Sequence, residues 1–209
     1  RLSEASKGKD TTTGHWELAG VTVDKPLATY PDGFPKEIMD EFASLTGRGW
    51  LWGMPASGTV IIERLGKEHL LTGKPIVYTS ADSVFQIAAH EDVIPVGELY
   101  EICKIARGLL DRHNVGRVIA RPFDGRPGSF KRTERRKDFS LEPPSETLLD
   151  ALKKSGASVV GIGKVPDIFC HRGFTSEVPA SGNKEILDKA LSEWVALNEG
   201  LVLANLVDF

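Results

Sequence analysis

The chain has 209 residues, of which 41% are hydrophobic, and a formal net charge of -3. This length fits one large domain or two small ones, and the mixed charge excludes the strong positive field that general binding to nucleic acid or to an anionic membrane requires. The sequence contains no apolar run long enough to cross a bilayer and no hydrophobic secretion segment, so we expect a soluble, cytoplasmic protein with no membrane or nucleic-acid partner.

The N-terminal half is predicted to alternate between helices and short strands. A first helix should begin at Thr11, because Asp10 before it is a typical capping residue. Helical spacing of apolar residues predicts helices over 35–45 and 57–65. The run 74–80 is β-prone and predicts a strand, and residues 82–89 behind it are predicted to be helical.

The middle of the chain combines an amphipathic helix with a charged segment. Apolar residues recur with a period of 3.6 over 97–112, which predicts a helix, and residues 117–121 predict a strand. Residues 122–142 are charged, contain Gly and Pro, and show no periodic apolar face. We therefore expect a hinge or ligand loop there.

The C-terminal third reads as helix, strand, helix, strand. A helix is expected over 145–155, a buried strand over 157–162, a helix with an apolar stripe that ends near Leu197, and a fully buried strand over 200–209. This order predicts parallel strands and an α/β fold in this region.

Thr11 is the first candidate for chemistry. A hydroxyl at a helix start lies beside backbone N–H groups and the positive end of the helix dipole, both of which suit a phosphoryl group. A threonine hydroxyl needs a metal ion or a general base to become a good nucleophile. Helix capping is the alternative role for this residue.

A basic group is the second candidate. Arginine binds phosphate with two parallel hydrogen bonds, so a cluster of arginines favours a phosphate ligand. A solvated charged loop and single-stranded RNA binding remain alternatives. The group comprises Arg117, Arg121, Arg126, Lys131, Arg132, Arg135, Arg136 and Lys137.

Two further residues follow predicted strands. Asp82 could accept hydrogen bonds from sugar hydroxyls or could cap the helix expected behind it. Lys164 could reach a phosphate or could be an ordinary surface lysine. Cys103 and Cys170 are interpreted as reduced packing residues, and the five histidines show no spacing typical of a complete metal site.

Several segments, taken in chain order, resemble the phosphopentomutases, a branch of the alkaline phosphatase superfamily. The match extends essentially from end to end of the chain. The segments are GKDTTTGHWE at 8–17, YTSADSVFQIAAHE at 78–91, RVIARPF at 117–123, FKRT at 130–133 with Arg136, VGIGKVPDIF at 160–169 and NLVDF at 205–209.

The resemblance implies roles for individual residues. Thr11 would carry the phosphoryl group and contact a pair of metal ions, usually manganese. Asp82 would hold the sugar. Substrate phosphate would be bound by Arg121, Arg132, Arg136 and Lys164.

The resemblance also implies a fold and a reaction. A cap domain of mixed α+β structure over 26–142 would be inserted into part of an alkaline-phosphatase-like α/β core, supplied by residues 1–25 and 143–209. The reaction interconverts (deoxy)ribose 1-phosphate and (deoxy)ribose 5-phosphate through a phosphothreonine, and glucose 1,6-bisphosphate or ribose bisphosphate activates the enzyme.

The chain would be a central piece of such an enzyme. In the family the other metal ligands would lie before Arg1 and after Phe209, and Asp208 does not match one of them. We therefore expect the isolated chain to be inactive. A pentose-phosphate-binding fragment without turnover and another phosphomutase or phosphatase of the superfamily are the alternatives.

Overall fold

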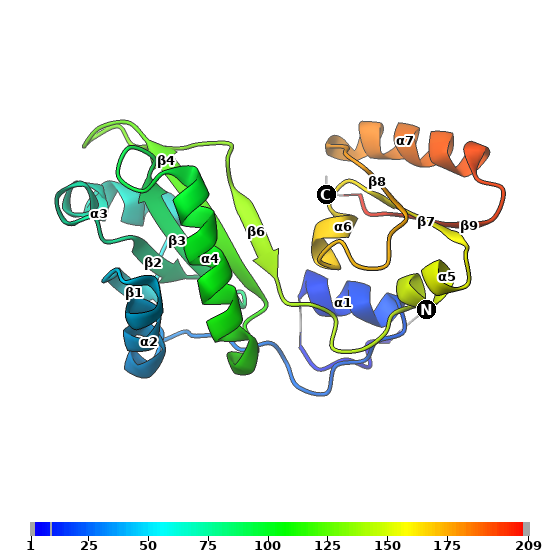
Figure 1. Cartoon of the computed structure of the whole chain (residues 1–209), viewed down its shortest axis with the longest axis horizontal. Coiled ribbons are helices and arrows are strands. Elements are labelled where there is room, and N and C mark those ends of the chain that lie inside the picture. The colour runs from blue at the N-terminus through cyan, green and yellow to red at the C-terminus, as the bar shows by residue number, and fades with distance from the viewer. Residues whose placement is uncertain (1–2, 9, 207–209) are drawn as a thin grey trace. The chain divides into compact units, whose positions relative to one another are not determined.

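A computed structural model describes residues 3–8 and 10–206. The chain forms two compact units (Figure 1). The central unit is continuous and runs from Leu27 to Leu141, whereas the flanking unit combines the chain up to Pro26 with the chain from Glu142 onward. No helix within the described residues is both long and apolar enough to span a membrane.

The central unit is built on a mixed six-stranded sheet. Its strands run in the order β1-β2-β3-β4-β5, and β6 also pairs with β4. The pairs β1/β2 and β3/β4 are parallel, and the others are antiparallel. The strands are β1 (Leu51–Pro55), β2 (Ile76–Thr79), β3 (Val84–His90), β4 (Arg117–Asp124), β5 (Lys131–Arg132) and β6 (Lys137–Ser140).

Helices cover both faces of this sheet, because successive strand residues point to opposite faces and apolar side chains lie on each face. One core joins Phe42 of α2 and Leu99 of α4 to Phe85 and Val118 of the sheet. The other joins α3 to strand residues that include Tyr78. The helices are α2 (Lys36–Thr46), α3 (Gly58–Thr72), α4 (Val96–Leu110) and the short 3₁₀ helix η1 (Asp111–His113).

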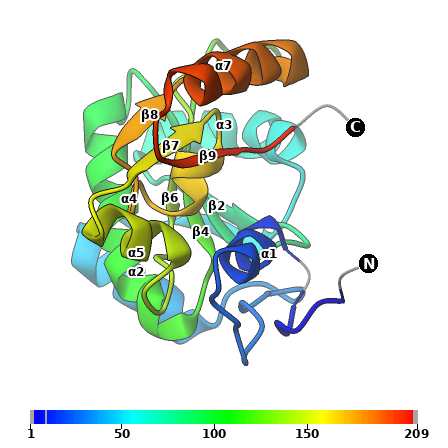
Figure 2. The same ribbon diagram turned by 90° about the vertical axis from the view of Figure 1, so that its right-hand side faces the viewer.

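The flanking unit has a three-stranded parallel sheet in the order β8-β7-β9. In Figure 2, α7 lies over one face of this sheet, and α5 and α6 lie on the other. Trp16 anchors α1 by donating a hydrogen bond from its indole to the carbonyl of Ile168 at 3.2 Å. The elements are α1 (Thr11–Leu18), α5 (Leu148–Lys154), β7 (Ser158–Ile162), α6 (Val165–Ile168), β8 (Ser176–Val178), α7 (Gly182–Ala196) and β9 (Gly200–Ala204).

The predicted α/β class is confirmed. The structure also confirms most of the predicted elements, with shifts at their ends. The confirmed helices are the one expected to begin at Thr11 and those over 35–45, 57–65, 97–112 and 145–155, and the confirmed strands are those over 74–80, 117–121 and 157–162. The third helix is longer than predicted, because it continues from Gly58 to Thr72. The parallel pairing of β7 with β9 follows the helix-strand order that the sequence indicated.

The helix predicted over 82–89 is wrong. Residues 84–90 form β3, and all seven are buried, because β3 lies between β2 and β4 in the sheet. A strand that is covered on both faces has no solvent-facing positions, so its sequence lacks the regular apolar/polar alternation that would distinguish it from a buried helix.

Two further predictions also need correction. Residues 122–142 contain β5 and β6, two short strands that are exposed or half-buried and whose charged side chains hid the pattern. The last strand is only half-buried over 201–203, because among the described residues β9 pairs with β7 alone. Lys9 and residues 207–209, including Asp208, lie outside the described residues.

Candidate functional site

At the start of α1, the environment of Thr11 differs from that of Thr12 and Thr13. Asp10 caps the helix, since its Oδ1 accepts a hydrogen bond from the amide of Thr13 at 2.9 Å. The hydroxyl of Thr13 donates to Asp10 Oδ2 at 3.0 Å. Thr12 and Thr13 are buried, whereas Thr11 is exposed. No described residue hydrogen-bonds to the Thr11 hydroxyl, so it is presented at the positive end of the helix.

The segment that precedes α1 is also fixed to it. Glu17 accepts hydrogen bonds from the amides of Ala5 and Ser6 at 2.8 and 2.7 Å. Hydrogen bonds from Ser6 and Ala5 lower the pKa of Glu17. The carboxylate is therefore ionised at neutral pH and ties the chain before Asp10 to the body of the helix.

Lys164 belongs to the same unit as Thr11 but makes no hydrogen bond with it. It follows β7 and is the residue directly before α6. Its side chain is exposed. The structure therefore places Lys164 at the carboxyl end of a parallel strand, where ligands of α/β sheets bind.

Arg121 lies within the central sheet. Its Nε donates to Oε1 of Gln86 at 3.1 Å, which fixes the guanidinium on the face of the sheet that bears Tyr78. Burial lowers the pKa of Arg121, and the positive charge of Arg136 acts in the same direction. An anion bound here would relieve this repulsion between the two arginines.

Arg132 and Arg136 differ in their partners. Arg136 forms two hydrogen bonds of 2.7 Å with the carboxylate of Asp138. Arg132 in β5 is exposed, and no described residue forms a hydrogen bond or an ion pair with its side chain. β5 is positioned by pairing with Phe123 of β4.

Tyr78 is a further candidate site residue, which the sequence patterns did not single out. It is 1% exposed, and its hydroxyl has no hydrogen-bond partner among the described residues. Burial raises the pKa of Tyr78, while the charges of Arg121, Arg132 and Arg136 act in the opposite direction. The only sequence signal was its place at the start of the segment 78–91.

Asp82 lies apart from the arginines that were assigned to phosphate. It occupies the bend between β2 and β3, and its side chain is 67% exposed. Its Oδ2 is 3.8 Å from Nη2 of Arg117. Since a strand follows instead of a helix, the alternative role of Asp82 as a helix cap is wrong, and the carboxylate is accessible to a ligand.

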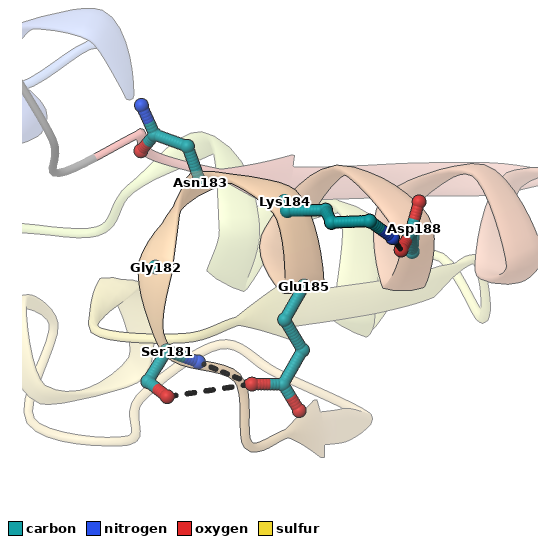
Figure 3. A pocket seen from close by; sticks show the side chains of 6 residues that line it. All are labelled: Ser181, Gly182, Asn183, Lys184, Glu185 and Asp188. Carbon is teal, nitrogen blue, oxygen red and sulfur yellow. Dashed lines mark hydrogen bonds and ion pairs between the residues drawn. The ribbon is translucent and has the colours of Figure 1, made fainter.

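A hollow of about 340 Å³ at the start of α7 is a weaker candidate (Figure 3). Glu185 accepts a hydrogen bond from the amide of Ser181 at 2.9 Å, and Lys184 pairs with Asp188 at 2.6 Å. Lys184 and Asp188 therefore neutralise each other, and Glu185 is occupied in capping the helix start. The lining residues are Ser181, Gly182, Asn183, Lys184, Glu185 and Asp188.

No family model matches the chain. Curated proteins do match it, across all of its residues. The chain is 56% identical to the phosphopentomutase of Dictyoglomus thermophilum, 56% identical to that of Caldanaerobacter subterraneus and 54% identical to that of Alkaliphilus metalliredigens. The chain matches the phosphopentomutase family along its whole length. It spans about half the length of these relatives, namely 53% to 54%.

Similarity to phosphopentomutases raises the question of a metal centre. Across residues 3–8 and 10–206, no group of three or more His, Cys, Asp or Glu side chains could hold a metal ion. The described residues therefore do not form the binding site for two metal ions that the resemblance to phosphopentomutases implies, and no reaction step is derived through a metal.

Proposed function

We propose that the protein to which this sequence belongs is a phosphopentomutase that interconverts (deoxy)ribose 1-phosphate and (deoxy)ribose 5-phosphate. The observation that carries this proposal is 54% to 56% identity to curated phosphopentomutases over the entire chain. Such an enzyme is an isomerase, because it moves a phosphoryl group between two hydroxyls of one sugar.

Thr11 is the proposed carrier of the phosphoryl group. Phosphothreonine at this position would transfer its phosphoryl group to the unphosphorylated hydroxyl of a pentose phosphate, which gives a bisphosphate and the threonine hydroxyl. Thr11 would then accept the phosphoryl group from the other end of the bisphosphate, so the enzyme is regenerated. The exposure of Thr11 at the start of α1 supports this role, since the helix dipole stabilises a phosphate there.

The substrate contacts are proposed separately for each unit. In the central unit, Arg121, Arg132 and Arg136 would bind phosphate and Asp82 would accept hydrogen bonds from sugar hydroxyls. The mutual repulsion of the arginines and the exposure of Asp82 support these roles. In the flanking unit, the exposed Lys164 would bind phosphate. The central unit would correspond to the cap domain of the family.

The remaining expectations concern groups outside this chain's described residues. A pair of manganese ions would support the reaction, and glucose 1,6-bisphosphate or ribose bisphosphate would prime Thr11. A cytoplasmic location fits a phosphorylated sugar substrate. Because the resemblance places the other metal ligands outside the chain, we propose that the 209-residue chain alone binds pentose phosphate without turnover.

An activity assay tests the function. The complete protein, supplied with manganese and glucose 1,6-bisphosphate, should convert ribose 1-phosphate to ribose 5-phosphate. Absence of conversion by a folded sample would contradict the proposal. Faster turnover of another phosphate ester in the same assay would favour a different phosphomutase or phosphatase of the superfamily.

A further inference from the structure

The unit β1-α3-β2 has the architecture of an anion site. β1 and β2 are parallel neighbours, and α3 connects them. Helices that follow a parallel strand in this way direct their first amides toward ligands at the carboxyl end of the sheet. The N-cap residue Ser57 makes no side-chain hydrogen bond to the helix. No described residue accepts a hydrogen bond from the amide of Gly58 or Thr59.

The buried hydroxyl of Tyr78 meets this helix start. A Cβ atom added to Gly58 would lie 2.5 Å from the Tyr78 hydroxyl oxygen, so the two groups are in direct contact. This hydroxyl is buried, yet no described residue hydrogen-bonds to it. Leaving a buried hydroxyl unpaired is costly, and such groups commonly mark a missing ligand. This second observation is independent of the helix dipole.

Arg132 supplies a positive charge at the same place. Its Nη1 would lie 3.5 Å from a Cβ atom on Gly58. Glu63 of α3 accepts hydrogen bonds from the amides of Gly128 and Phe130, which holds the segment leading to Arg132 against the helix. The Phe130 ring packs on Gly66, where a Cβ atom would be 2.3 Å from the ring. Arg132 is thus delivered to the start of α3 by contacts within one unit.

We propose that the first amides of α3, the Tyr78 hydroxyl and the Arg132 guanidinium bind one phosphate group of the substrate. This inference rests on the proposed function and adds Tyr78 and the start of α3 to the phosphate-binding residues. The hydroxyl is closed to solvent in this conformation, so phosphate binding requires the groups around it to move. The proposed site requires glycine at position 58, because the Cβ atom of any larger residue would clash with the Tyr78 hydroxyl.

The test uses the 209-residue chain and inorganic phosphate, followed by ribose 5-phosphate. In NMR spectra, the backbone amide resonances of Gly58 and Thr59 should shift as phosphate is added. The dissociation constant for phosphate should rise roughly tenfold in Tyr78→Phe, as expected for the loss of one hydrogen bond to a charged group. Arg132→Gln should weaken binding by a similar factor. The matched controls are Tyr100→Phe, which removes a hydroxyl bonded to the carbonyl of Arg135, and Arg112→Gln.

Stability provides the second readout. Without phosphate, Tyr78→Phe should unfold at the same or a higher denaturant concentration than the wild type, because it removes an unpaired buried hydroxyl. With phosphate, the wild type should gain more stability than the variant. Unchanged phosphate affinity in folded Tyr78→Phe would overturn the inference, as would shifts confined to residues remote from α3.

These outcomes are separable from failure of the proposed function. If the complete protein lacks phosphopentomutase activity but phosphate still shifts the Gly58 amide, the proposed function fails and the phosphate site remains. If the complete protein is active but Tyr78→Phe leaves both phosphate affinity and the KM unchanged, the function remains and the site is wrong.

Discussion

Asp10 caps α1 by accepting hydrogen bonds from both the backbone amide and the hydroxyl of Thr13, at 2.9 and 3.0 Å. The cap fixes the conformation in which Thr11 is exposed. Asp10→Ala should lower the free energy of unfolding by about 1 kcal/mol, the usual cost of removing a helix cap. Urea denaturation of the 209-residue chain measures it. Asp24→Ala, which removes an exposed carboxylate, is the control, and an equal loss in both variants would contradict the capping role.

Stability should depend on the protonation of His69. Its Nε2 accepts a hydrogen bond from the amide of His90 at 2.8 Å, and Nδ1 donates to the carbonyl of Lys74 at 2.7 Å, so the folded protein needs the neutral ring. Burial lowers the pKa of His69. The unfolded chain therefore takes up the proton at a higher pH, and stability present above about pH 6.5 should be lost as pH falls below it.

Denaturant titrations between neutral and mildly acidic pH measure this effect. His69→Gln should flatten the pH dependence while lowering stability at neutral pH. His113→Gln is the control, because His113 lies near the end of η1 and is not buried. A pH dependence that is identical in wild type and His69→Gln would contradict the assignment.

A partly buried ion pair should contribute more than an exposed one. Arg172 donates to both oxygens of Asp150, at 3.1 and 2.9 Å, and also to the carbonyls of Pro143 and Ser145. Burial acts to raise the pKa of Asp150, but hydrogen bonds from Arg172 and Thr147 outweigh it and lower the pKa. The stability from this carboxylate should accordingly be lost as pH falls through the acidic range.

Substitution separates this pair from the exposed pair Lys184–Asp188. Arg172→Met should lower the free energy of unfolding by about 2 kcal/mol, because several hydrogen bonds to a charged group are lost. Lys184→Met should change the free energy of unfolding far less than Arg172→Met does, since the Lys184 side chain is 91% exposed. Equal effects of the two substitutions would show that the Arg172 contacts stabilise the protein no more than the exposed ion pair does.

The two cysteines should differ in reactivity. Burial raises the pKa of Cys103, which lies on the buried face of α4, whereas Cys170 is partly exposed. A thiol reacts through its thiolate, so Ellman's reagent should modify Cys170 in the native chain and Cys103 only after unfolding. Cys170→Ser should abolish the native-state reaction. Rapid modification of Cys103 in that variant would contradict the buried position.

The sequence predicted most helices because their apolar residues recur at a clear period. The stripe over 97–112 became α4, and its residues Leu99 and Cys103 are buried as the period requires. The same rule failed at β3, where Val84 to His90 are buried on both faces. It also overstated the burial of α7, since among its helix residues Ile186 is buried whereas Leu191 and Trp194 are more than 60% exposed.

The candidate site could be predicted only in part. Thr11 followed from local rules, because its cap and helix are contiguous in sequence. Tyr78 could not be found in this way, since its importance depends on Gly58, which lies 20 residues earlier and meets it only through the packing of α3 on the sheet. Likewise, local sequence does not show that the Arg136 side chain pairs with Asp138 whereas that of Arg132 has no hydrogen-bond partner among the described residues.

The most direct test of the account is to locate the phosphoryl group. The complete protein should be incubated with glucose 1,6-bisphosphate and manganese, quenched in acid, digested and mapped by mass spectrometry, with Thr11→Ala and Thr12→Ala alongside. The account predicts phosphate on Thr11 in the wild type and in Thr12→Ala, and no phosphopeptide and no mutase activity in Thr11→Ala. Phosphate on another residue, or full activity in Thr11→Ala, would contradict it.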